Sequence, residues 1–242
     1  MAIAGMGGVG GLLAERLIRL GVGQLKITDP GDFEQSNLNR QFGSSVLNLG
    51  QNKAEAIFAQ IKDINPQSQI YYGTSGITTD NDASLFVSGC DLVIDEMDFG
   101  LFRESILLQR AARRRGIYYI FASAIGFGAL VVIFDPQGLT LEEYNKFPID
   151  VDLDNTESLR VPQERILPVV PSYAAATAAD IVQKVIKGET PAPTISIGAG
   201  LASIVAANEA INIILKRRSI AKAPEYTYID LLDQRFIVGT VS

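Results

Sequence analysis

The chain has 242 residues, of which 47% are hydrophobic and 20% charged, and 21 basic against 27 acidic side chains give a net charge of −6. This composition is typical of a globular protein rather than a disordered one, and the acidic balance argues against a protein that holds nucleic acid mainly through phosphate contacts. The chain has no histidine and one cysteine, Cys90, which excludes Ser-His-Asp catalysis, His-ligated metals, internal disulfides and CxxC zinc sites within the chain itself.

Hydrophobic periods of two and of about 3.6 residues alternate along the chain, which is typical of βαβ units around a mainly parallel sheet. The pattern predicts strands at residues 1–4, 25–28, 69–72, 92–95, 118–122 and 129–134, and helices at 13–20, 54–64 and 102–115. An irregular acidic segment at 136–168 is followed by predicted apolar helices at 173–187 and 201–215 and short strands at 226–230 and 236–238. We therefore expect one domain, residues 1–242, of the α/β class: a Rossmann-like, mainly parallel sheet flanked by helices, with antiparallel strands toward the C-terminus.

A glycine-rich loop joins the first predicted strand to the first helix. Gly5, Gly7 and Gly10 fit the pattern G-x-G-x-x-G, in which glycines let the backbone turn tightly and approach a phosphate at the helix N-terminus. Asp29 follows Gly10 by 19 residues, at the end of the second strand, where a carboxylate can accept both ribose hydroxyls. The pattern predicts an adenine nucleotide and leaves NAD and ATP open; the alternative is a loop whose glycines serve only tight strand–helix packing.

Two cations in the next segment favour a triphosphate. Arg40 lies in the polar stretch SNLNRQ at 36–41, and Lys53 enters the next helix from GQNK at 50–53. Arginine binds phosphate oxygens through two parallel hydrogen bonds and lysine supplies a compact charge, whereas a dinucleotide gains little from two cations here. Either cation alone would be read as a solvated surface charge.

With these stretches the chain resembles the ThiF/MoeB/HesA superfamily, the bacterial relatives of ubiquitin-activating enzymes. The matching residues are GMGGVGG at 5–11, Asp29, SNLNRQ, GQNK and DFGLFR at 98–103, which stands for the family's D-N-x-x-x-R. The resemblance implies adenylation of a carboxylate by Mg²⁺ and ATP, with release of pyrophosphate. The implied substrate is the C-terminus of a small ubiquitin-like sulfur-carrier protein or of a peptide.

The resemblance also implies a role for each matching residue. It implies that the glycine loop holds the nucleotide, that Asp29 binds the ribose and that four polar side chains bind the phosphates. It also implies that Asp98 binds Mg²⁺ and that Arg103 supports the Asp98 loop. The loop glycines are Gly5, Gly7, Gly8 and Gly10, and the phosphate-binding side chains are Asn37, Arg40, Gln41 and Lys53. The residues expected to act in catalysis are Arg40, Lys53 and Asp98.

The chain departs from the family pattern at several positions. Phe99 replaces the family's usual Asn after the metal-binding Asp, and the preceding Asp95 and Glu96 make this stretch unusually acidic, which either strengthens Mg²⁺ binding or marks a site that has drifted. Cys90 is expected to be a core residue, so the chain has no thioester cysteine and would stop at the adenylate or pass it to an external nucleophile.

Further expectations concern partners, location and alternatives. The two apolar helices predict a homodimer, as relatives form, and the 136–168 crossover is expected either to gate the substrate tail or to be a surface loop. No apolar run reaches the ~18 residues of a membrane span, and the start is too short and glycine-rich for a signal peptide, so we expect a cytoplasmic protein without membrane or nucleic-acid partners. A silent ATP-binding scaffold and an NAD-binding oxidoreductase remain the alternatives.

Overall fold

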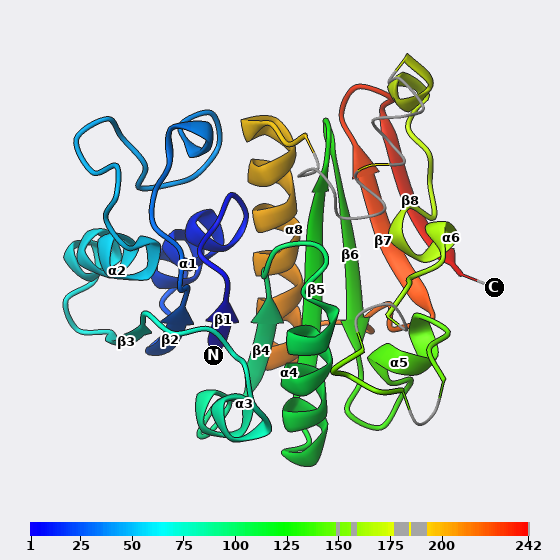
Figure 1. Cartoon of the computed structure of the whole chain (residues 1–242), viewed down its shortest axis with the longest axis horizontal. Coiled ribbons are helices and arrows are strands. Elements are labelled where there is room, and N and C mark those ends of the chain that lie inside the picture. The colour runs from blue at the N-terminus through cyan, green and yellow to red at the C-terminus, as the bar shows by residue number, and fades with distance from the viewer. Residues whose placement is uncertain (149–150, 156–158, 177–183, 185–192, 242) are drawn as a thin grey trace.

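The fold is built on one mixed sheet. The computed structural model describes residues 1–148, 151–155, 159–176, 184 and 193–241. Their eight strands lie in the order β3-β2-β1-β4-β5-β6-β7-β8 (Figure 1). Neighbours are parallel from β3 to β5 and antiparallel from β5 to β8, which confirms the predicted fold class. The strands are β1 (Ala2–Ala4), β2 (Gln24–Thr28), β3 (Gln69–Gly73), β4 (Leu92–Asp95), β5 (Tyr118–Ile125), β6 (Gly128–Phe134), β7 (Glu225–Asp230) and β8 (Arg235–Thr240).

Helices cover both faces of this sheet, each over its own cluster of buried hydrophobic side chains. One face carries α1 (Gly10–Arg19), α2 (Lys53–Ile64) and α8 (Ser196–Leu215), and the other carries α3 (Asp80–Phe86), α4 (Phe102–Arg114) and α5 (Leu141–Tyr144). The shorter elements are η1 (Gln35–Asn37), α6 (Gln163–Ile166) and η3 (Ser172–Ala176). The sequence did not predict α3, because seven residues are too few to show a helical stripe; its local signal is a capping box between Thr79 and Asp82.

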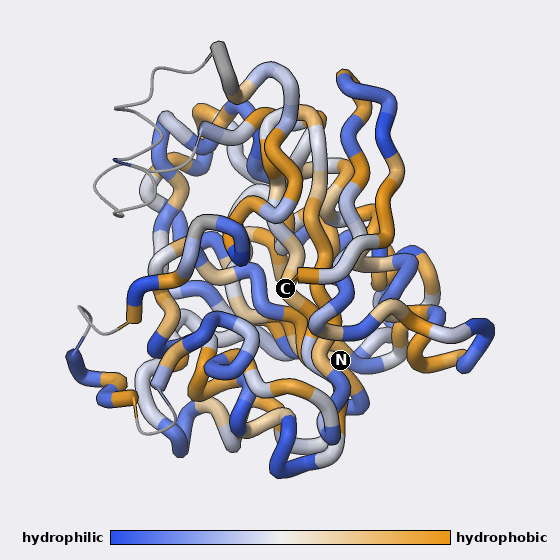
Figure 2. Tube along the Cα trace, turned by 90° about the vertical axis from the view of Figure 1, so that its right-hand side faces the viewer, coloured by the Kyte–Doolittle hydropathy of each residue, from blue (hydrophilic) through white to orange (hydrophobic). Residues whose placement is uncertain are grey.

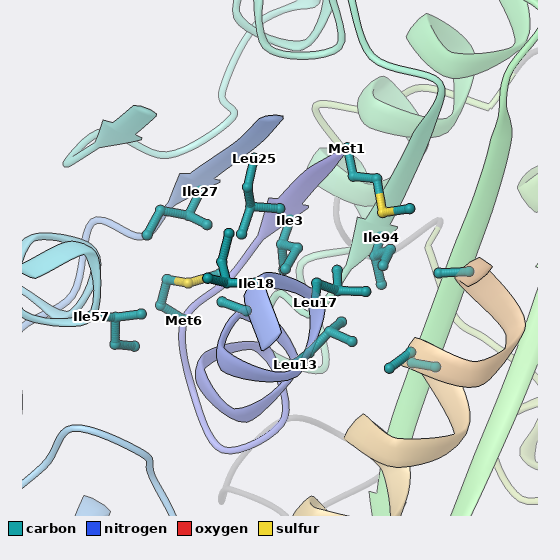
Figure 3. Close-up of a cluster of buried hydrophobic side chains, with 14 of the residues drawn as sticks. Met1, Ile3, Met6, Leu13, Leu17, Ile18, Leu25, Ile27, Ile57 and Ile94 are labelled. Atoms are coloured by element: carbon teal, nitrogen blue, oxygen red, sulfur yellow. The ribbon is translucent and has the colours of Figure 1, made fainter. Parts of the chain in front are cut away.

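The first cluster holds α1 against the parallel half of the sheet. In Figure 3, Leu13 and Leu17 of α1 lie near Ile3 of β1 and Ile94 of β4, and all four side chains are fully buried. Leu13 and Leu17 are one helical turn apart, so they face the sheet together. Burial of each such side chain stabilises the fold by about 1.5–3 kcal/mol. Figure 2 shows the same pattern over the whole chain, with hydrophobic stretches along the inner strands and hydrophilic stretches mainly at outer turns.

Helix α8 is the long apolar helix of the described chain. By length and composition it could cross a membrane, but half of its apolar window is buried in this fold, where it packs on α1, β5 and β6. The buried Glu209 carboxylate accepts a hydrogen bond from Arg218. The helix predicted at 201–215 is confirmed and begins earlier, at Ser196. The helix predicted at 173–187 falls mostly outside the described residues, and its described start belongs to the 3-10 turn η3.

The acidic crossover at 136–168 is largely irregular, as predicted, and is anchored by α5. Thr140 caps α5 by accepting from the Glu143 amide at 3.0 Å, and Glu142 accepts from Arg110 of α4 at 2.7 Å. The Tyr144 ring packs edge-on against Phe134 of β6 at a centroid distance of 5.3 Å. These contacts hold the described part of the crossover over the second helical layer.

The parallel half of the sheet brings the segments with the sequence motifs to one edge. Ala4 of β1 lies opposite Thr28 of β2 on one side and Asp95 of β4 on the other, so the loops that follow the three strands begin side by side. The chain runs from β1 to β2 and β3 in one direction and then returns to β4 on the opposite side of β1. In open α/β sheets, ligands bind where the strand order reverses in this way.

Two glycines of α8 provide a matched test of its packing. A Cβ on Gly198 would overlap the Gly126 carbonyl oxygen, whereas a Cβ on Gly200 would meet no atom within 4 Å. We expect Gly198→Ala to lower the free energy of unfolding by about 1–3 kcal/mol through overpacking. Gly200→Ala should raise it by up to about 1 kcal/mol, because alanine favours helix. Urea unfolding of both variants measures this, and equal effects would show that α8 does not pack closely on the β5–β6 turn.

Candidate functional site

The glycine loop packs tightly on the end of β4, and only part of it is open to a ligand. Gly5 has φ +93°, and a Cβ on it would overlap the Glu96 carbonyl; a Cβ on Gly10 would overlap the Gly5 carbonyl. These two glycines are therefore required by the fold itself. A Cβ on Gly7 would meet only Gln41 Nε2, at 3.8 Å, and one on Gly8 would lie 3.4 Å from Cγ of Arg40. Gly7 and Gly8 therefore face the segment predicted to bind phosphate.

The start of α1 carries partial positive charge that no side chain of its own N-cap or first turn neutralises. Its N-cap residue, Val9, makes no side-chain capping bond, and the first turn has no acidic residue. The amide groups of such a turn and the helix dipole together attract an anion. This end of the helix therefore fits the phosphate-binding role that the sequence predicted for the loop.

Asp29 lies at the end of β2 and joins it to the glycine loop. One carboxylate oxygen accepts a hydrogen bond from the Met6 amide at 2.6 Å and the other accepts from the Gly31 amide at 2.7 Å. Asn52, which sequence reasoning missed, caps α2 and donates to the Asp29 and Gly31 carbonyls at 3.0 and 3.2 Å. A carboxylate oxygen accepts more than one hydrogen bond, so Asp29 keeps acceptor capacity for ribose hydroxyls.

The 36–41 segment lies beside the glycine loop. Arg40 donates from Nη1 to the Ser36 carbonyl at 2.9 Å and to Asn39 Oδ1 at 2.8 Å, and the structure gives its other guanidinium N–H groups no protein acceptor. Asn39 in turn donates to the Thr194 carbonyl at 3.1 Å, which ties the segment to the start of α8. Asn37, which was also predicted to bind phosphate, accepts a hydrogen bond from the Glu34 amide at 3.0 Å through its side-chain oxygen Oδ1. This oxygen therefore organises the turn. Arg40 is thus held in place with donors to spare.

Gln41 brings an unpaired polar atom to the glycine loop, and Lys53 brings one to the turn that follows Asp29. Gln41 is 9% exposed, its Oε1 is buried without a hydrogen-bond partner in the structure, and its Nε2 lies near Gly7. Lys53 begins α2, its ammonium lies near Gly31, and no described residue pairs with it. Buried polar groups in folded proteins are nearly always satisfied by protein or water, so the unpaired Gln41 oxygen at the glycine loop indicates a place for a polar partner. The Lys53 ammonium by Gly31 adds a cation at the neighbouring turn.

Of the acidic residues at the end of β4, Asp98 alone is exposed. The Asp95 side chain is fully buried and accepts hydrogen bonds from Tyr119 Oη and from the Met97 amide at 3.0 Å. Burial raises the pKa of the Asp95 carboxyl above its usual range, and burial with the neighbouring Asp95 charge raises the pKa of Glu96 further still. No group of three or more Asp, Glu, Cys or His among the described residues could hold a metal. Asp95 therefore does not extend the predicted Mg²⁺ site, and Asp98 is the carboxylate that fits it.

Two other sequence expectations concern Arg103 and Cys90. Arg103, expected to support the Asp98 loop, instead donates to the Thr78 carbonyl at 2.6 Å and to Asp154 at 3.1 Å, so it links α4 to the crossover. Cys90 is 9% exposed and precedes β4, so it lies at the opposite edge of the sheet from the glycine loop. This placement agrees with its prediction as a core residue.

Comparison with known proteins places these residues in a family context. A model of the ThiF family matches residues 1–241. The chain is 37% identical over 98 residues to the tRNA threonylcarbamoyladenosine dehydratase of Bacillus subtilis. The aligned stretch covers 40% of this chain and 39% of that protein. It is 29% identical over 126 residues to the sulfur carrier protein ThiS adenylyltransferase of the same organism, 51% of this chain and 37% of that protein.

The fold is shared with Escherichia coli MccB. The structure of MccB with ATP matches with a TM-score of 0.73 and 20% identity, over 99% of this chain and 62% of that one. MccB with AMPCPP and MccA gives a TM-score of 0.72. The chain thus spans less than two thirds of the length of each of these relatives, and the low identity to MccB shows the fold alone.

The buried Asp95 predicts a pH dependence of stability. The pKa of the Asp95 carboxyl is raised from 3.8. As the pH rises above about 4, the folded protein therefore keeps a proton that the unfolded chain loses. The contribution of Asp95 to stability therefore falls with rising pH. Asp95→Asn removes this loss, so the free energy of unfolding of the variant should rise relative to the parent as the pH rises above about 4, the usual pKa of an aspartic acid. Urea unfolding across this range measures it, with Asp91→Asn, exposed before β4, as control; parallel curves for parent and Asp95→Asn would contradict the assignment.

Proposed function

This chain belongs to the ThiF family of E1-like adenylyltransferases, and from that premise we propose that it uses Mg²⁺ and ATP to adenylate a carboxylate. The observation that carries the proposal is that Arg40 and Gln41 lie against the glycine loop while the Lys53 ammonium lies by Gly31, next to Asp29, with polar atoms left unpaired among the described residues. An isolated packing loop would not need these groups. A triphosphate between the start of α1 and the two cations would satisfy them.

The reaction requires little acid–base chemistry from the protein. An ionised carboxylate oxygen attacks the α-phosphorus of ATP, the bond to the bridging oxygen breaks, and pyrophosphate leaves with the electron pair. The nucleophile needs no general base at neutral pH, so a chain without histidine can carry the reaction. Catalysis then rests on positioning and on neutralising charge, which Arg40 and Lys53 supply at the phosphates.

Two carboxylates have distinct roles in this proposal. Asp29, held by the Met6 and Gly31 amides, would accept the ribose hydroxyls and fix the nucleotide in register with the loop. Asp98, exposed at the end of β4, would contribute one oxygen ligand to Mg²⁺. Mg²⁺ is usually held by one or two carboxylates together with phosphate oxygens, so a single carboxylate fits, and the ion would neutralise phosphate charge.

We propose a peptide or a small ubiquitin-like sulfur-carrier protein as the donor of the carboxylate. Support comes from the names of the relatives: one acts on the sulfur carrier ThiS, and MccB was solved with MccA. Cys90 lies at the far edge of the sheet, so the adenylate would be released or passed to an external nucleophile. We further propose a cytoplasmic homodimer, with one domain per chain and without membrane or nucleic-acid partners.

One observation favours a second substrate. The 37% identity to a tRNA threonylcarbamoyladenosine dehydratase covers 98 residues, and a threonylcarbamoyl group ends in a carboxylate that could be activated in the same way. The net charge of −6 opposes a tRNA substrate, because phosphate contacts need a basic surface. An ATP–pyrophosphate exchange assay with tRNA as the carboxylate donor, compared with the same assay with a peptide or carrier protein, distinguishes the two substrates.

Calorimetric titration tests the nucleotide site. Mg·ATP should bind the parent, and Arg40→Ala should weaken binding by at least about tenfold, because a charge-assisted hydrogen bond contributes about 1.5–3 kcal/mol. Asp98→Ala should weaken Mg·ATP binding but leave binding of metal-free ATP nearly unchanged. Arg115→Ala, an exposed cation at the end of α4, is the matched control and should bind as the parent does.

The alternatives give different outcomes. NAD⁺ binding that ignores Arg40→Ala and Asp98→Ala would overturn the proposal in favour of a dinucleotide site. Mg·ATP binding without ATP–pyrophosphate exchange, tested with peptides, ThiS-like carriers and tRNA, would identify a silent scaffold.

A further inference from the structure

A cavity lies beside Asp98, between the start of α4, the face of β5 and β6, and the crossover. Its volume is about 60 Å³ and its walls are mainly aromatic and aliphatic; they include Phe99, Leu101, Phe121, Val132, Leu141 and Val161. The cavity arises because the crossover packs through α5 and α6 onto the antiparallel half of the sheet. The glycine loop is not among its lining residues.

Asp98 and Phe99 connect this cavity to the proposed nucleotide site, because both line it. Phe99, the residue that departs from the family pattern, is 38% exposed and packs edge-on against Phe102 at a centroid distance of 5.2 Å. A carboxylate reacting beside Asp98 would therefore leave the neighbouring side chains of its own peptide close to the cavity entrance.

Tyr144 places an unpaired polar group in the wall. The side chain is 4% exposed, and its hydroxyl is buried without a hydrogen-bond partner among the residues that the structure describes. The Arg165 guanidinium lies 5.2 Å from the ring centroid, and burial raises the pKa of the Tyr144 hydroxyl to about 12, so it stays an O–H donor at neutral pH. A buried tyrosine hydroxyl usually has a partner, so this one indicates a place for an acceptor.

We infer that this cavity binds an uncharged side chain from one of the last two residues of a peptide whose C-terminal carboxylate is adenylated. This inference rests on the proposed function and adds substrate specificity to it. Apolar walls favour the body of the side chain, and the Tyr144 hydroxyl would donate to an acceptor at its end. A charged side chain would lose its hydration to mainly apolar walls, and the Arg165 guanidinium in the wall already lies over the Tyr144 ring. Glycine would leave the walls in contact with water.

The test uses a set of peptides that differ at one position. N-acetylated heptapeptides carry Gly, Leu, Gln or Glu at the last or the penultimate position, and calorimetry measures their binding to the full chain in Mg²⁺ and a non-hydrolysable ATP analogue. At one of these positions, Leu and Gln should bind about tenfold or more tightly than Gly, and Glu should not.

Two variants connect this preference to the cavity. Val161→Phe fills it and should abolish the preference for Leu and Gln over Gly, whereas Val238→Phe, exposed on β8, should leave the preference unchanged. Tyr144→Phe removes the hydroxyl and should weaken Gln peptides about three- to tenfold while Leu peptides stay within about twofold, the effect of one neutral hydrogen bond. Binding of the ATP analogue checks that each variant is folded.

The outcomes separate this inference from the proposed function. Equal binding of Gly, Leu and Gln peptides, no peptide binding, or a preference that survives both cavity variants would overturn the inference, even if ATP–pyrophosphate exchange occurs. Selective binding that the variants abolish would support the cavity even without exchange, and the proposed adenylation would then be wrong. If Tyr144 holds a water molecule instead of the peptide side chain, Tyr144→Phe should change the binding of Gln and Leu peptides equally. That result would contradict the proposed hydrogen bond from the Tyr144 hydroxyl.

Discussion

The contact between the glycine loop and the end of β4 is the constraint on which the site depends. The backbone at Gly5 meets the Glu96 carbonyl so closely that no Cβ fits, and Gly10 meets the Gly5 carbonyl in the same way. This contact sets the start of α1 against the sheet, with its amide groups at the edge where the strand order reverses. Asp29 then joins β2 to the same loop through the Met6 amide, so the residues proposed to hold the ribose and the phosphates belong to one network.

The two halves of the sheet supply different parts of the proposed reaction. The parallel half carries the groups proposed to bind the nucleotide, because its strands end side by side: Arg40 and Gln41 lie at the glycine loop, and Lys53 lies by Gly31. The antiparallel half and the crossover carry the cavity with Tyr144. Asp98 and Phe99 follow β4, between the halves, where an activated phosphate and a bound side chain could meet. Such a division lets the substrate preference change without altering the nucleotide site.

Sequence reasoning could predict what local patterns determine. The period of the apolar residues predicted every strand to within a few residues. The glycine pattern and Asp29 mark a loop and a strand end that the structure joins through the Met6 amide, and the nucleotide there stays a prediction. Burial and pairing depend on long-range contacts and could not be predicted: Asp95 pairs with Tyr119 of β5, Asn37 organises a turn, and Arg103 reaches Asp154 in the crossover. The cavity joins segments more than 40 residues apart, from Phe99 to Val161, so no spacing along the chain could reveal it.

The most direct test of the account is a crystal structure of the chain with Mg²⁺ and a non-hydrolysable ATP analogue. The account predicts the triphosphate between the start of α1 and the side chains of Arg40, Gln41 and Lys53, with the ribose on Asp29 and the metal on Asp98. A nucleotide bound elsewhere, or one whose phosphates leave Gln41 Oε1 and the Lys53 ammonium unpaired, would contradict it.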